Sequence, residues 1–303
     1  MVGSGTSESC TSEVVVSAIA EGGIIHFDCG SEPHTIVLKE TAKIMNDSTE
    51  EIVIDGGGLI TLSGGGERRI LYMNTCDPAL VWTTPHCDNQ DHPRLTLQNL
   101  RFVDGDSTGS LEEGGGGGAV FVRGGRLKIV NSVFERNRCE ELGPDLGGGA
   151  LRVLSQHEGR PVYIAGSRFG AEGDAGNRCS NGGAISSIGV SFIITRSEFL
   201  SNRAIGYGAN PARQGTPGGG SGGALYLDGN DFSLSLSRVR IEANHAREGG
   251  GAIFFVRNDR SGSLRIEHSE LIDNRSEGFE TSGYPGIFIL ADGDPEIVES
   301  VLR

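Results

Sequence analysis

One short block of sequence returns five times between residues 117 and 276, and it constrains the fold more than any other feature. Each copy opens on two glycines, an alanine and an aliphatic residue, and the alanines are Ala119, Ala150, Ala184, Ala224 and Ala252. Their spacing of 28 to 40 residues indicates a constant unit with loops of variable length. A unit of this size cannot bury an apolar face alone, so consecutive units must stack on one another.

Short strand-like runs fill each unit, such as Ala119–Val122 and Leu127–Val130, and glycine or polar turns separate them. Three short strands per unit, irregular loops and a recurring turn asparagine predict an all-β chain, folded as a right-handed parallel β-helix of about nine or ten coils. Upstream, residues 11–20 are expected to form a short capping helix, because Thr11 can cap its start and Gly22 can end it. Such a helix would cover the open end of the stack.

The whole chain, residues 1–303, is expected to be one domain, because no segment is long enough to serve as a linker. Residues 1–30 would form the N-terminal cap and first strand. Residues 31–116 would form the first coils, and residues 117–303 the repeat coils.

Stacking would place equivalent residues of neighbouring units about 4.8 Å apart, the spacing of paired strands. The turn asparagines would then form a ladder of side-chain hydrogen bonds, made of Asn137, Asn177, Asn202, Asn244 and Asn274. Cys139 and Cys179 occupy one column of this register, with Cα atoms about 5 Å apart, which is within disulfide reach. We therefore expect a bond between them.

Six cysteines without a CxxC pair or a Cys/His cluster favour disulfides over a metal site. Proximity in sequence suggests the pairs Cys10–Cys29 and Cys76–Cys87. The alternative is six free thiols in a cytosolic protein. Disulfides favour a secreted or cell-surface location. Residues 1–10 lack the basic and apolar stretches of a signal peptide, which we expect to have been removed.

The net charge limits the classes of molecule that the chain is expected to bind. With 26 basic and 40 acidic residues the net charge is −14, which argues against nucleic-acid binding. No run of 18 apolar residues exists, so no membrane span is predicted, and we expect a monomer. No metal or cofactor is predicted, although acidic turns at residues 103–106, 227–231 and 291–294 keep calcium as an alternative.

Two family resemblances follow from these motifs. The GGA and FxxN pairs of residues 117–276 resemble the repeats of the polymorphic outer-membrane protein family of adhesins. Residues 10–102, with Phe27-Asp28-Cys29-Gly30 and Ile54-Asp55-Gly56-Gly57-Gly58, look like the first coils of pectate-lyase-like β-helix proteins. The second resemblance implies an extracellular fold that binds or acts on acidic polysaccharide, often with calcium. The calcium-aspartate constellation of the lyases is not found in this sequence.

The residue two places after each repeat alanine must point outward, because the residue between them is aliphatic and points inward. This outward column consists of Phe121, Arg152, Ser186, Tyr226, Phe254 and Phe288. Sugars dock on aromatic faces, and arginine pairs with uronate carboxylates. The column therefore predicts a polysaccharide groove along the GGA strands, with Phe121 and Phe254 in contact with substrate.

If the groove catalyses a reaction, Tyr226 or Arg152 is the expected proton-transfer group, and Asp228 is its expected partner. Asp228 belongs to the next outward column, in which Arg123 is expected to bind substrate.

A long glycine-rich insertion, residues 203–223, enters the strand that carries Tyr226. It would wall the groove with Tyr207 and Arg213, which we also expect to bind substrate.

These observations predict an exported protein that binds or cleaves polysaccharide, including uronate-containing polymers. As an enzyme it would be a polysaccharide lyase or a glycoside hydrolase. Two alternatives stay open. The inserted loops could cover the rings as a second small core, with the charged residues in salt bridges and turns. The chain could also be a non-enzymatic cell-surface adhesin or structural module.

Overall fold

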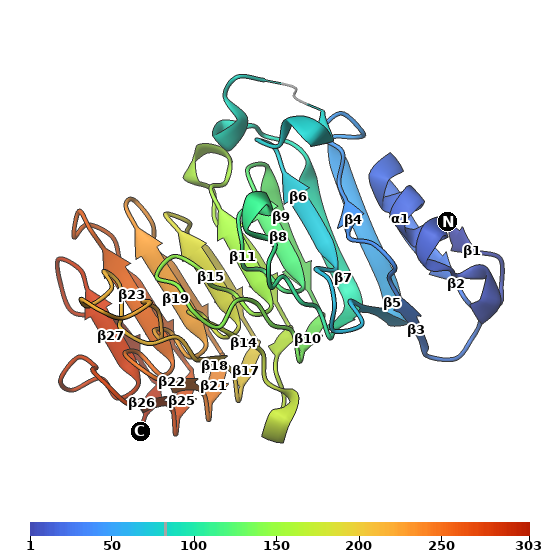
Figure 1. Ribbon diagram of the computed structural model, residues 1–303. Coiled ribbons are helices and arrows are strands. Elements are labelled where there is room, and N and C mark those ends of the chain that lie inside the picture. The colour runs from blue at the N-terminus through green and yellow to red at the C-terminus, as the bar shows by residue number, and fades with distance from the viewer. Residues whose placement is uncertain (82–83) are drawn as a thin grey trace.

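The computed structural model of the chain describes residues 1–81 and 84–303, and it is built almost entirely of parallel strands. Figure 1 shows these strands following one another from one end of an elongated stack to the other, with the two chain termini at opposite ends. Each repeat places its strands beside the equivalent strands of the previous repeat. The parallel, stacked architecture expected from the repeats is therefore present.

The GGA blocks lead into the strands of one sheet, which Figure 1 shows face on. Its strands are β4 (Ala42–Lys43), β6 (Leu71–Asn74), β8 (Val120–Arg123), β11 (Leu151–Leu154), β15 (Ile185–Ile188), β19 (Leu225–Gly229), β23 (Ile253–Arg257) and β27 (Ile287–Leu290). Small strands between the ladder asparagines and the GGA blocks form another sheet, made of β14 (Arg178–Cys179), β18 (Arg203–Ala204), β22 (His245–Ala246) and β26 (Arg275–Ser276).

The remaining 17 strands form the largest sheet, to which most repeats contribute two strands. They are β1 (Val2–Gly3), β2 (Ile24–Asp28), β3 (His34–Val37), β5 (Glu51–Ser63), β7 (Arg94–Val103), β9 (Arg126–Val130), β10 (Val133–Glu135), β12 (Val162–Ala165), β13 (Arg168–Phe169), β16 (Phe192–Thr195), β17 (Glu198–Leu200), β20 (Leu234–Ser237), β21 (Arg240–Glu242), β24 (Leu264–Glu267), β25 (Glu270–Ile272), β28 (Glu296–Val298) and β29 (Val301–Leu302).

The predicted capping helix is confirmed as α1 (Ser12–Glu21), which lies at the N-terminal end of the stack (Figure 1). Thr11 Oγ1 accepts a hydrogen bond from the Val14 amide, and the helix ends at Gly22, whose φ of 78° suits glycine. Val15 and Ile19 are buried in the main core. The short 3-10 helices are η1 (Ser7–Ser9), η2 (Pro78–Leu80), η3 (Cys87–Asn89), η4 (Leu111–Glu113), η5 (His157–Gly159) and η6 (Gly173–Ala175).

The asparagine ladder is also confirmed. At each step one side-chain amide donates to the side-chain oxygen of the next asparagine at 2.9 Å, in the order Asn137, Asn177, Asn202, Asn244, Asn274. Next to the ladder, rings on neighbouring strands stack with centroids 4.6 to 4.9 Å apart, in the order Phe102, Phe134, Phe169, Phe199. Both columns repeat at the strand spacing, so they fix the register along the stack.

All three predicted disulfides are present. Cys10–Cys29 and Cys76–Cys87 close short loops, with Cα atoms 5.7 and 4.9 Å apart. Cys139–Cys179 joins neighbouring repeats, with Cα atoms 4.8 Å apart. The register prediction for this last pair was therefore right. Within the described ranges, no helix has the length and apolar character needed to cross a membrane.

Candidate functional site

The predicted aromatic column has the expected register but not the expected exposure. Phe121, Tyr226 and Phe254 lie in line across the GGA sheet, yet they are only 1, 1 and 3% exposed. Phe121 packs with Tyr72 and Leu80, and the other two rings pack with Val256 and Phe279. The rings are therefore not exposed as expected, and they form the second small core that was the alternative.

The structure brings two of the three predicted catalytic side chains together. The Tyr226 hydroxyl donates to Asp228 Oδ2 at 3.1 Å and accepts from Asn210 Nδ2 at 2.9 Å. Burial, with the adjacent Asp228 charge, raises the pKa of Tyr226 well above its usual value. The phenol therefore stays protonated at neutral pH, which is unfavourable for a general base.

Arg152, the third predicted catalytic residue, lies two strands away from Tyr226, with Ser186 between them. Its guanidinium is buried and touches neither Tyr226 nor Asp228 by a hydrogen bond. Burial lowers its pKa to about 10. This arrangement does not assemble the predicted three-residue centre.

The insertion at residues 203–223 is held against the molecule rather than beside an open groove. Arg213 donates two hydrogen bonds to Glu248, at 2.7 and 2.8 Å. Tyr207 lies under the Arg247 guanidinium, 4.6 Å from the ring centroid to Cζ. Arg123, which was expected to bind substrate, pairs with Asp88 at 2.8 Å. These three of the five predicted substrate-binding side chains therefore have partners within the chain.

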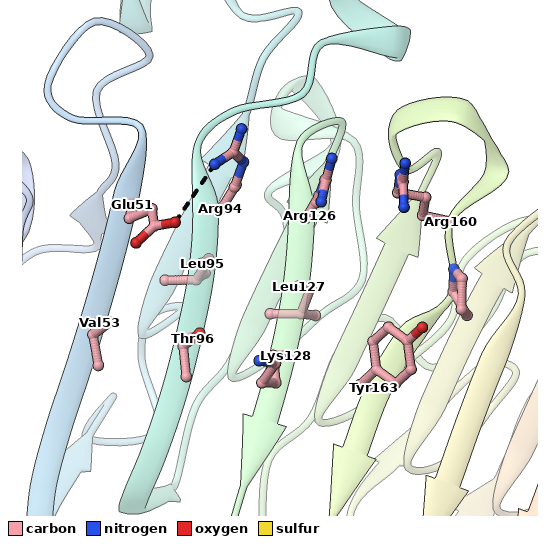
Figure 2. Close-up of a pocket in the computed structure, with 11 residues that line it drawn as sticks. Glu51, Val53, Arg94, Leu95, Thr96, Arg126, Leu127, Lys128, Arg160 and Tyr163 are labelled. Atoms are coloured by element: carbon pink, nitrogen blue, oxygen red, sulfur yellow. Dashed lines mark hydrogen bonds and ion pairs between the residues drawn. The ribbon is translucent and has the colours of Figure 1, made fainter.

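An open pocket of about 430 Å³ lies on the outer face of the largest sheet, and Figure 2 shows its walls. Its lining comes from β5, β7, β9 and β12 and from the two residues before β12. It consists of Glu51, Val53, Arg94, Leu95, Thr96, Arg126, Leu127, Lys128, Arg160, Pro161 and Tyr163. None of these residues is among the predicted site residues.

Strand alternation positions the floor of this pocket. Val53, Thr96, Lys128 and Tyr163 are register partners on four adjacent strands. The residues that flank them in each strand point into the core, so these four side chains point outward. Tyr163 is 47% exposed. The floor of the pocket is thus a row that ends in a lysine and an accessible aromatic ring.

Three arginines, Arg94, Arg126 and Arg160, form one edge of the pocket (Figure 2). Asp91 pairs with Arg94 at 2.5 Å and also with Arg126. Burial opposes ionisation of Asp91, but the hydrogen bonds from the two arginines outweigh it and lower its pKa. These two arginines are therefore positioned before any ligand arrives.

Lys128 differs from the arginines at the edge. The part of the chain that the structure describes offers it no hydrogen bond or ion pair, and its side chain is exposed. It lies beside Tyr163 in the next strand. An exposed ammonium next to an exposed ring can accept an anionic group and an apolar face at the same time.

Sequence reasoning missed this site because its strands belong partly to the first repeats, which lack the GGA block. The available signal was the alternation in Leu95-Thr96-Leu97, Leu127-Lys128-Ile129 and Val162-Tyr163-Ile164. Each of these segments places one outward residue between two inward ones. Only the register of unlike repeats combines them into one row.

Two of the acidic residues considered for calcium are paired with arginines. Asp104 accepts from Arg136 at 2.7 Å, and Asp106 accepts from Arg138 at 2.7 Å. Among residues 1–81 and 84–303, one group of possible ligand atoms converges, formed by Asp88 and the disulfide-bonded Cys76 and Cys87. Sulfurs in a disulfide are not thiolates, so this group does not fit a metal ion.

Comparison of the chain with protein-family models, curated proteins and solved structures finds no match.

Proposed function

We propose that this chain is an exported, monomeric, single-domain right-handed parallel β-helix of about nine or ten coils that binds acidic polysaccharide. Binding takes place in the pocket over β5, β7, β9 and β12, rather than along the GGA strands. The adjacent Lys128 and Tyr163 carry this proposal. The three disulfides and the resemblance to pectate-lyase-like proteins favour an extracellular setting and a uronate-containing ligand.

The chemistry of the floor suits one uronate unit of a chain. The Tyr163 ring can stack on a sugar face, and the Lys128 ammonium can pair with the carboxylate of that sugar. Arg94, Arg126 and Arg160 are paired with Asp91, Glu51 and Glu158, so Lys128 is the unpaired cation among the described residues that line the pocket. An acidic polymer would therefore bind in preference to a neutral one.

The pocket does not suit glycoside hydrolysis. Glycoside hydrolysis needs two carboxyl groups that face each other across the scissile bond. Glu51 is the one carboxylate among the 11 residues that line the pocket, and it lies 3.5 Å from Arg94. A non-enzymatic binding module, in line with the resemblance to adhesin repeats, is the favoured form of the proposal, and a polysaccharide lyase is the alternative.

The test compares polygalacturonate with neutral dextran by titration calorimetry, using wild type, Lys128→Ala and Tyr163→Ala. We expect binding of polygalacturonate alone, and a Kd about tenfold higher for each variant, because each removes one short-range contact. Lys39→Ala is the matched control, since Lys39 is an exposed lysine paired with Glu13 outside the pocket. Unchanged affinity in both pocket variants, or equal binding of dextran, would contradict the proposal.

A further inference from the structure

Among the described residues, three arginines are buried, and two of them have the partners that a buried charge requires. Arg69 donates to Glu113 at 2.7 Å and also to two backbone carbonyls. Arg257 donates twice to Asp259, at 3.0 Å each. Arg152, the third, is 5% exposed and has no hydrogen bond or ion pair to any residue that the structure describes.

An unpartnered buried guanidinium is strongly unfavourable. Two of its three nitrogens lose their hydration, and no hydrogen bond from the described residues replaces it. Nε and Nη1 of Arg152 are both inaccessible to solvent and without an acceptor. A methionine of similar length would fill the same space without this cost. The presence of arginine at this position therefore needs a partner that is not part of the described chain.

Arg152 is a polar residue that interrupts the aromatic column of the GGA sheet. Phe121 precedes it in the column, and Ser186 and then Tyr226 follow it. The segments at residues 140–147 and 206–219 meet through Gly143, whose amide donates to the Gly218 carbonyl at 3.2 Å. A second contact joins Asn210 Nδ2 to Asp145 Oδ1 at 3.4 Å. The charge of Asp145 also acts on Arg152, although the two do not pair.

We propose that Arg152 binds the carboxylate of a small organic acid, such as a uronic acid, between these two segments. The guanidinium presents five N–H donors, and a carboxylate can accept two of them in parallel. Separation of the Asn210–Asp145 contact gives the ligand its access. This site is on the GGA sheet, so it does not depend on the pocket proposed above.

The test follows thermal unfolding of the full chain at constant ionic strength, with D-galacturonate, neutral D-galactose or sulfate. We expect a saturable rise in Tm with galacturonate and no rise with galactose. The rise should persist in Lys128→Ala, which removes the other proposed site, and disappear in Arg152→Met. Without ligand, Arg152→Met should unfold at the wild-type temperature or above it, since it removes an unpaired buried charge.

Arg69→Met is the matched comparison, because it should lower Tm by leaving two backbone carbonyls without their donor and Glu113 with Lys43 alone. A decrease in Tm of similar size in Arg152→Met, together with a decrease in Asp145→Asn, would show that Asp145 is the counter-ion and would overturn the proposal. Absence of a galacturonate shift in the wild type would overturn it as well. A shift with sulfate but not with galacturonate would overturn the carboxylate assignment.

Discussion

Single asparagine side chains link neighbouring repeats of this molecule by hydrogen bonds. Asn202 donates to the Phe169 carbonyl and to Asn244 Oδ1, and its own oxygen accepts the backbone and side-chain amides of Asn177. Asn202→Ala should lower the free energy of unfolding by about 3 kcal/mol, because it leaves several buried groups unpaired. Denaturant unfolding measures this change in free energy. The control is Asn230→Ala, because Asn230 is exposed and lies outside the ladder. Equal stability of the two variants would show that the ladder does not hold the repeats together.

The register of residues could be predicted from the sequence, but their exposure could not. Asn137, Cys139 and Tyr226 occupy the columns that the repeat alignment predicted. Whether an outward ring meets water depends on where the inserted loops run, and loops of unequal length share no pattern between repeats. The outward Tyr226 is buried for this reason, whereas the outward Tyr163 is exposed.

The strands and the capping helix can be predicted from their own sequences. The position of the long insertion depends on contacts with residues far away in the chain. Thr11 and Gly22 mark the ends of α1 in the sequence itself. Nothing local indicates that Glu248 would hold the segment at residues 206–219. Its carboxylate accepts from Arg213 and from the Gly208 amide, at 2.7 to 2.8 Å. A sequence pattern could not predict these contacts, because the residues that make them are far apart in the chain.

The contacts of the Glu248 carboxylate should make the stability of the fold depend on pH. Burial opposes ionisation of Glu248, but the hydrogen bonds from Arg213 and Gly208 outweigh it and lower the pKa below the usual 4.5. A carboxyl group with a lowered pKa stabilises the fold above its unfolded-state pKa, and this stabilisation is lost as the pH falls through the folded-state pKa. The stability difference between wild type and Glu248→Gln should therefore be constant from pH 7 to about 5 and shrink below the usual pKa. Denaturant unfolding across this range measures it, and a constant difference down to pH 3 would contradict the anchor.

At the scale of the whole molecule, an acidic chain is proposed to bind an acidic polymer, and the two charges oppose long-range association. The net charge of −14 is spread over the whole chain, whereas the positive charges of Lys128 and of the arginines at the pocket edge are confined to the pocket. In 0.01 M salt the Debye length is about 30 Å, so an approaching polymer senses most of the molecule. In 0.15 M salt it is about 8 Å, so the polymer senses mainly the pocket.

The association rate constant for polygalacturonate should therefore rise between 0.01 and 0.15 M salt, opposite to the usual behaviour of a basic site that binds a polyanion. Surface-immobilised polygalacturonate with the protein in solution gives this rate directly. Lys128→Ala should keep the rise, since the repulsion comes from the whole chain, while its dissociation is faster because the short-range contact is lost. A rate constant that falls steadily with salt would mean that local charges already govern the approach at long range, and the argument from net charge would then be wrong.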